Sequence, residues 1–115
     1  MAGLNRVLKR SARLSITAVG RQRMRALNRA YRGVDRPTNV LSIGWGNKRT
    51  VMGDIIVCPA VIAQEVPRPK MIQRTQHLIV HAALHILGYD HEHGGQQART
   101  MERLEQKVLG WNPYQ

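Results

Sequence analysis

The spacing of the histidines is the feature that most constrains this 115-residue sequence. All five histidines lie within residues 77–93, and three form the pattern His81-Ala-Ala-Leu-His85-Ile-Leu-Gly-Tyr-Asp-His91. On a helix, His81 and His85 project from one face because they are four residues apart. A continuous helix would carry His91 about 15 Å beyond His81. The chain must therefore turn, and Gly88 accepts the left-handed conformation that ends helices. The pattern predicts three imidazoles around one metal ion at the end of a helix.

The remaining histidines allow a second ligand set. Three neutral imidazoles leave the fourth position of a zinc ion open, as in catalytic sites. His77, His81 and His85 could form such a triplet, but on a straight helix His77 and His85 are about 12 Å apart along the axis. We therefore expect His81, His85 and His91 to bind the metal, and His77 to pack beside a ligand or support one. His93 is expected at the surface, with a weak auxiliary ligand as the alternative.

The same spacing occurs in the zinc-binding helix of metzincin proteases, His-Glu-x-x-His-x-x-Gly-x-x-His. Ala82 stands where those enzymes need the glutamate that acts as general base. A methyl group cannot take a proton from water. Peptide hydrolysis by that mechanism is therefore disfavoured, although the metal-binding histidines are present.

The charge of the chain points to a polyanionic partner. Eighteen Lys and Arg against seven Asp and Glu give a net charge of +11. Residues 1–32 contain nine basic side chains and no acidic one, so the positive field is concentrated there. This excess favours nucleic acid. Residues 21–32 lack the strong apolar face of a membrane-surface helix. The nine are Arg6, Lys9, Arg10, Arg13, Arg21, Arg23, Arg25, Arg29 and Arg32.

The single cysteine and the lengths of the apolar segments indicate the compartment. Cys58 has no partner for an internal disulfide, which argues against a disulfide-stapled secreted module. The apolar stretches are far shorter than the roughly 20 residues that cross a bilayer. No apolar run like a secretory signal follows the basic N-terminus. We expect a cytoplasmic protein with one domain over residues 1–115.

Apolar periodicity and turn residues predict a fold of the α+β class. The longest helix is apolar around much of its circumference, so we expect it to be buried against a sheet, with the zinc site at its end. Gly44, Gly46 and Asn47 are expected in a loop between the second and third strands. The predicted strands are 14–19, 40–43 and 51–57, and the predicted helices are 21–32, 59–66, 70–87 and 95–109.

Three segments closely resemble the YbeY family of bacterial metal-dependent endoribonucleases. They are residues 28–42 (Asn-Arg-Ala-Tyr-Arg-Gly-Val-Asp-Arg-Pro-Thr-Asn-Val-Leu-Ser), residues 53–55 (Gly-Asp-Ile) and the histidine motif of residues 81–91. The match covers most of the chain in the expected order. Ile43-Gly44 stands where the family usually has Phe-Pro, and Ala82 replaces the usual glycine after the first histidine.

The resemblance implies a fold, a site and a function. It implies a small mixed, mostly parallel sheet covered by helices, with a basic groove leading to one Zn²⁺ held by His81, His85 and His91. It implies that Arg32 contributes to catalysis near the metal. The expected activity is single-strand-specific endonucleolytic cleavage in ribosomal RNA maturation and ribosome quality control, with the small ribosomal subunit as partner and no membrane.

The parts of this predicted site suggest how it would work. Arg32 offers a planar fork of donors that can stabilise charge on a phosphate. Asp54 and Asp90 are candidates for the general base, although a strand hydrogen bond and a turn, respectively, also explain them. The alternative function is a non-catalytic, zinc-containing ribosome-assembly factor that binds ribosomal RNA through its basic face.

Overall fold

A computed structural model describes residues 11–46, 49–88 and 95–114 of the chain. Strands and helices are mixed along the sequence, which confirms the predicted α+β class. In order, the elements are β1 (Ser11–Ala18), α2 (Arg21–Arg32), β2 (Val40–Gly46), β3 (Thr50–Val57), α3 (Pro59–Glu65), the short 3₁₀ helix η1 (Arg68–Lys70), α4 (Met71–Ile86) and α5 (Gly95–Leu109).

The strands form one mixed sheet in the order β1-β3-β2. β1 runs parallel to β3, from Ser11 opposite Thr50 to Ala18 opposite Val57. β2 runs antiparallel to β3, with Val40 opposite Val57. Within the described residues, the sheet therefore has one parallel and one antiparallel strand pair, so it is mixed rather than mostly parallel. The described strands leave β2 at one edge of the sheet, and this edge matters for the site below.

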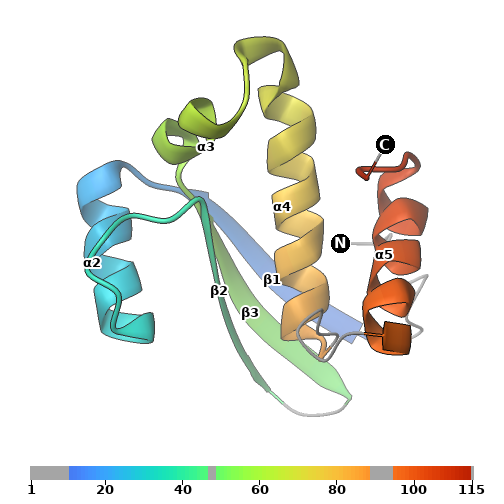
Figure 1. The fold of residues 1–115 in the computed structure, drawn as a ribbon. Coiled ribbons are helices and arrows are strands. Elements are labelled where there is room, and N and C mark those ends of the chain that lie inside the picture. The colour runs from blue at the N-terminus through green and yellow to red at the C-terminus, as the bar shows by residue number, and fades with distance from the viewer. Residues whose placement is uncertain (1–10, 47–48, 89–94, 115) are drawn as a thin grey trace.

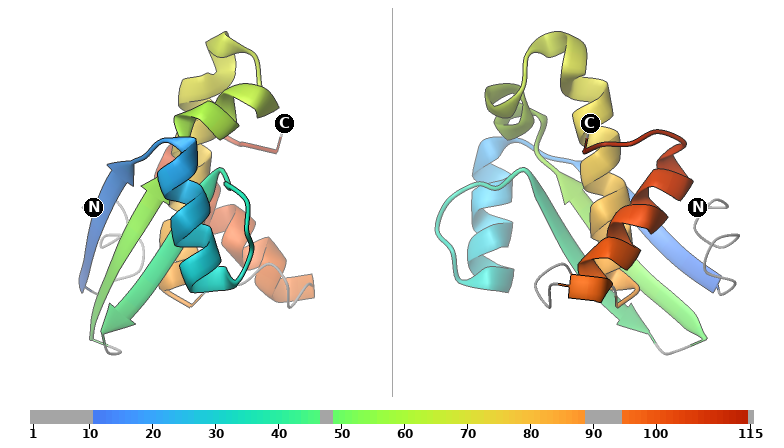
Figure 2. Two further views of the ribbon diagram at one scale, coloured as in Figure 1. Left: turned by 90° about the vertical axis from the view of Figure 1, so that its left-hand side faces the viewer. Right: turned by 45° about the vertical axis from the view of Figure 1, so that its right-hand side comes forward.

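The central strand β3 places apolar side chains on both faces of the sheet, because successive residues of a strand point in opposite directions. Val51, Ile55 and Val57 join a core with α4 and α5. Ile56 faces the other way and joins a smaller core with Met24 of α2. Helices α4 and α2 therefore cover opposite faces of the sheet (Figure 1). Helix α5 packs on α4 and runs antiparallel to it (Figure 2).

Two glycines allow α4 to approach the sheet closely. Gly44 of β2 lies opposite Gly53 of β3, and the side chain of Ile86 lies over both. A Cβ atom at either position would be 2.8 Å from Ile86. The expected loop at Gly44 and Gly46 is therefore wrong: both residues belong to β2, because they pair with β3 beneath the helix.

The predicted helices are found with small shifts at their ends. α2 has the predicted bounds, and α4 is shorter than expected by one residue at each end. Cys58 is buried and forms no disulfide. None of the helices in the described ranges has both the length and the apolar character needed to cross a membrane.

Candidate metal centre

Helix α4 brings two of the three predicted metal ligands together. The rings of His81 and His85 are stacked, with centroids 6.3 Å apart and an interplanar angle of 21°. α4 ends at Ile86, and Gly88 has a φ of 101°. The predicted turn at Gly88 is therefore confirmed. The third predicted ligand, His91, lies outside the described residues, as do Asp90 and His93.

A pocket at the β2 edge of the sheet joins these histidines to the predicted catalytic arginine. Its volume is about 450 Å³. Arg32 comes from the end of α2 on one face of the sheet, and His81 and His85 come from α4 on the other. A neighbouring pocket of about 380 Å³ shares Ser42 and His85 with it. The larger pocket is lined by Arg32, Val40, Leu41, Ser42, His81, Ala82 and His85.

Arg32 is held in place by the turn that follows it. Gly33 has a φ of 72°, and its N–H bonds to the carbonyl of Arg29 at 3.0 Å, which ends α2 directly after Arg32. The side chain of Asn28, 1% exposed, donates to the carbonyl oxygen of Arg36 at 2.8 Å. This bond ties the outgoing chain back to the helix. The arginine is thus an exposed side chain on a fixed backbone.

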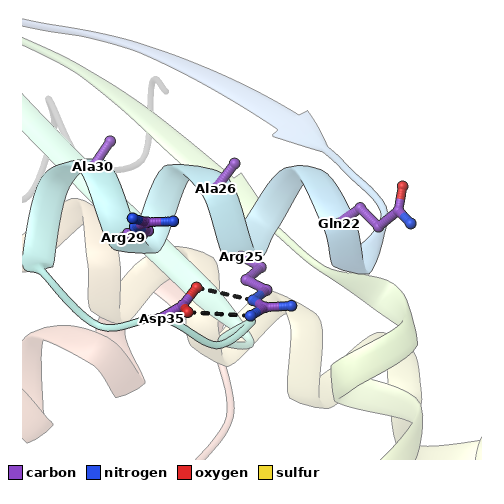
Figure 3. Close-up of a pocket in the computed structure, with 6 residues that line it drawn as sticks. All are labelled: Gln22, Arg25, Ala26, Arg29, Ala30 and Asp35. Atoms are coloured by element: carbon purple, nitrogen blue, oxygen red, sulfur yellow. Dashed lines mark hydrogen bonds and ion pairs between the residues drawn. The ribbon is translucent and has the colours of Figure 1, made fainter.

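The outer face of α2 carries arginines that lead toward Arg32. Residues three or four apart share a helix face, so Arg25, Arg29 and Arg32 form one stripe. Arg25 donates to both carboxylate oxygens of Asp35, at 2.9 and 3.1 Å (Figure 3). Its hydrogen bond holds the pKa of Asp35 below its usual value. A hollow of about 520 Å³ lies beside this stripe, and Gln22, Ala26 and Ala30 also line it.

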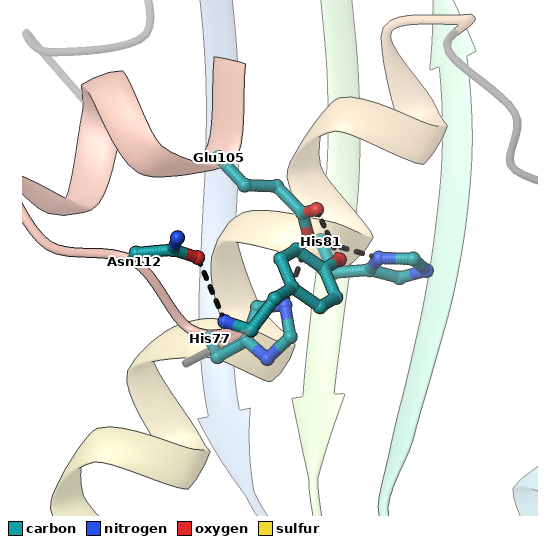
Figure 4. A network of polar contacts seen from close by, with 5 residues as sticks. His77, His81, Glu105 and Asn112 are labelled. Atoms are coloured by element: carbon teal, nitrogen blue, oxygen red, sulfur yellow. Dashed lines mark hydrogen bonds and ion pairs between the residues drawn. The ribbon is translucent and has the colours of Figure 1, made fainter. Parts of the chain in front are cut away.

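On the α5 side of His81 lies a buried carboxylate. Glu105 has an exposed fraction of 0%, and its Oε2 is 3.0 Å from both Nε2 of His77 and Nδ1 of His81. The hydroxyl of Tyr114 donates to Oε1 at 2.5 Å. Figure 4 shows His77 and His81 on the Glu105 carboxylate, with the far end of the His81 ring pointing away from it. We call these four residues the Glu105 network.

The Glu105 network stabilises the ionised form of the carboxylate. Burial on its own would raise the pKa of Glu105, but the hydrogen bonds from His77, His81 and Tyr114 together outweigh it and hold that pKa well below the usual value. Burial, followed by the bond to Glu105, raises the pKa of the Tyr114 phenol. The phenol therefore stays protonated and donates.

The donor atoms in this region fit a metal site. His77, His81 and Glu105 each offer one ligand atom, and these atoms lie within 4.8 Å of one another. Imidazole and carboxylate are ligands that zinc accepts. His81 thus lies between two possible sites: the Glu105 network on one side and the pocket with His85 on the other. Arg32 lines the pocket with His81 and His85, and it is not part of the Glu105 network.

Two site residues differ from the expectations of the sequence. Asp54 bonds to the hydroxyl of Ser15 and lines a pocket with Tyr31, on the α2 face of the sheet. It therefore lies on the face opposite His85, and the structure does not support it as a general base there. Glu105 was missed, although its position four residues after Met101 places it on the apolar face of α5.

Comparison with known proteins identifies the family to which this fold and these histidines belong. The sequence matches the family described as Endoribonuclease YbeY over residues 2–111. The chain belongs to the YbeY family.

Individual relatives carry the same name, Endoribonuclease YbeY. The protein of Burkholderia ambifaria is 42% identical over 114 residues, which covers 91% of this chain and 65% of the relative. The Polaromonas naphthalenivorans protein is 38% identical and covers 96% and 78%, respectively. The Bordetella pertussis protein is 45% identical and covers 85% and 64%. The chain thus spans less than two thirds of the Burkholderia and Bordetella proteins.

The fold also has a counterpart among solved structures. The solution structure of TM1509 from Thermotoga maritima superimposes with a TM-score of 0.64 at 24% identity, and the match covers 95% of this chain and 78% of that one. At this level of identity the likeness concerns the fold. It supports the arrangement of helices around a small mixed sheet.

Proposed function

We propose that this chain is a zinc-dependent endoribonuclease that cleaves single-stranded RNA in ribosomal RNA maturation. The observation that carries the proposal is the pocket at the β2 edge, which Arg32, His81 and His85 line together. The relatives named Endoribonuclease YbeY support it independently. The substrate would be ribosomal RNA of the small subunit, in the cytoplasm.

The proposed metal ligands are His81, His85 and His91, with one Zn²⁺ per chain. The stacked rings of His81 and His85 on successive turns of α4 suit ligands of a single ion. When bound, zinc supplies Lewis-acid chemistry: it polarises a phosphoryl oxygen and lowers the pKa of water. With three protein ligands, the site would be of the catalytic rather than the structural type.

The chain's own residues would bind and orient the RNA. Arg32 donates its N–H fork to the scissile phosphate and stabilises the charge that develops there. Arg29 holds a neighbouring phosphate along the outer face of α2, without reading the bases. The basic stripe of α2 would thus guide the strand to the pocket.

Metal analysis and RNA cleavage by highly purified protein test this proposal. The native chain is expected to contain one zinc ion and to cut single-stranded RNA, and His85→Ala should lose both properties. His93→Ala is the matched control, because His93 lies in the same histidine-rich window and is not a proposed ligand. RNA binding without cleavage by zinc-loaded protein would contradict the enzyme and favour a non-catalytic assembly factor.

A further inference from the structure

The Glu105 network contacts the proposed metal centre from the side opposite the pocket. Nδ1 of His81 lies 3.0 Å from Oε2 of Glu105. The ring's other nitrogen, Nε2, lies at the end of the ring that points away from the carboxylate (Figure 4). We propose that Glu105 is the positioning residue of the metal centre, which fixes the tautomer of His81 and orients its Nε2 toward the metal. This inference rests on the proposed role of His81 as a ligand.

The chemistry of imidazole explains why one carboxylate has this effect. A neutral imidazole carries one proton, and only the other nitrogen has a lone pair for a metal. An ionised carboxylate accepts hydrogen bonds and donates none. Glu105 therefore selects the tautomer with the proton on Nδ1. Carboxylates that accept from the second nitrogen of a metal-binding histidine commonly fix its tautomer and ring orientation in this way.

The geometry of the carboxylate suits a fixed acceptor. Tyr114 bonds to Oε1 at 2.5 Å, and His77 shares Oε2 with His81 at 3.0 Å. Glu105 is thus held from α4 and from the C-terminal segment at once. Because the Glu105 side chain is buried, its carboxylate stays in a fixed position. On this proposal, His77 and Tyr114 hold the Glu105 carboxylate in place and do not bind the metal.

Packing alone gives no reason for a carboxylate here. Its neighbours on α5, Met101 and Leu104, belong to the hydrophobic core between α4 and α5. A buried charge costs free energy of desolvation, and apolar replacements of buried ionic groups are often neutral or stabilising. A charged residue kept among apolar neighbours is consistent with a role toward His81. The role predicts that folding and metal affinity respond differently when Glu105 is replaced.

The experiment compares Glu105→Leu and Glu105→Gln with Glu102→Gln, a change on the same helix at a carboxylate that acts on Tyr114 through its charge alone. The first readout is the ¹⁵N NMR spectrum of the histidine rings in metal-free protein at about pH 8. Native protein and Glu102→Gln should carry the His81 proton on Nδ1. Glu105→Leu should shift it to Nε2, and Glu105→Gln, whose amide oxygen still accepts, should retain it.

The second readout is zinc affinity, measured by competition with a chelator. Glu105→Leu should bind zinc about 10- to 100-fold more weakly, with helical content unchanged by circular dichroism. The zinc affinity of Glu105→Gln should lie between that of the native protein and that of Glu105→Leu. Unchanged affinity together with an unchanged tautomer in Glu105→Leu would overturn the proposal.

Two further outcomes are decisive. If zinc binding persists in His85→Ala but disappears in His77→Ala, the metal lies within the Glu105 network, and Glu105 is a ligand rather than a positioning residue. If Glu105→Leu fails to fold, the native protein still decides, because a His81 proton on Nε2 refutes the proposal. The metal-free spectrum requires no RNA cleavage, so failure of the proposed function can be told apart from failure of this inference.

Discussion

Gly44 of β2 lies directly opposite Gly53 of β3, and the side chain of Ile86, at the end of α4, lies over both glycines. A Cβ atom at Gly53 would lie 2.8 Å from Cδ1 of Ile86 and 2.9 Å from the carbonyl oxygen of Ile43. His85 precedes Ile86 directly. The glycine pair therefore sets how close the predicted ligand lies to the sheet.

Gly53→Ala should destabilise the protein by about 1–3 kcal/mol, because the added methyl group overpacks the contact with Ile86. Urea unfolding measures the change. Gly20→Ala is the control: its Cβ would meet nothing within 4 Å, and its φ of −80° suits any residue. Equal destabilisation by the two changes would contradict the role given to the glycine pair.

Arg32→Ala should reduce RNA cleavage by about 10²–10³-fold, the usual effect of removing a group that stabilises transition-state charge. Arg32→Lys should recover little, because lysine lacks the bidentate fork. Melting temperature and zinc content should stay near native values, since Arg32 is exposed. Arg36→Ala, nearby but outside the pocket lining, should cut RNA normally. Full cleavage by Arg32→Ala would remove the arginine from the mechanism.

His91→Ala should lose zinc, whereas His93→Ala should retain it. The reason is the spacing of His91 from His81 and His85 across the turn at Gly88. Elemental analysis of protein purified without a chelator measures the difference. Equal zinc contents in the two variants would show that the third ligand is misassigned.

Arg29→Ala should weaken RNA binding and make its salt dependence shallower. Each lost phosphate contact on a single strand lowers the slope of log K against log salt by about 0.7. Arg23→Ala is the matched control: it lines a pocket with Ser15 and Asp54, away from the outer stripe of α2. The measurement is the RNA affinity of both variants across a series of salt concentrations. A larger effect from Arg23 than from Arg29 would redirect the RNA path to the other side of α2.

Local sequence signals predicted most of the elements and part of the site. The apolar spacing of residues 21–32 gave α2 with its observed bounds, and Gly88 marked the turn after α4. The prediction of a loop at Gly44 and Gly46 was wrong because it relied on the rule that glycine weakens a strand. Here a partner strand and a helix side chain compensate, and neither is visible in the local sequence. The expected single domain and the role of His91 stay predictions.

The sequence by itself determined that His81 and His85 share one helix face: their four-residue spacing places both rings there wherever that helix packs. Only the tertiary structure decided what surrounds them. Arg32 reaches the same pocket because β2 is the edge strand and α2 ends beside it. Glu105 meets His81 because α5 packs antiparallel on α4. Spacing along one helix is a local property of the chain, whereas these contacts join distant segments and exist only once the apolar faces of the sheet and helices are buried together.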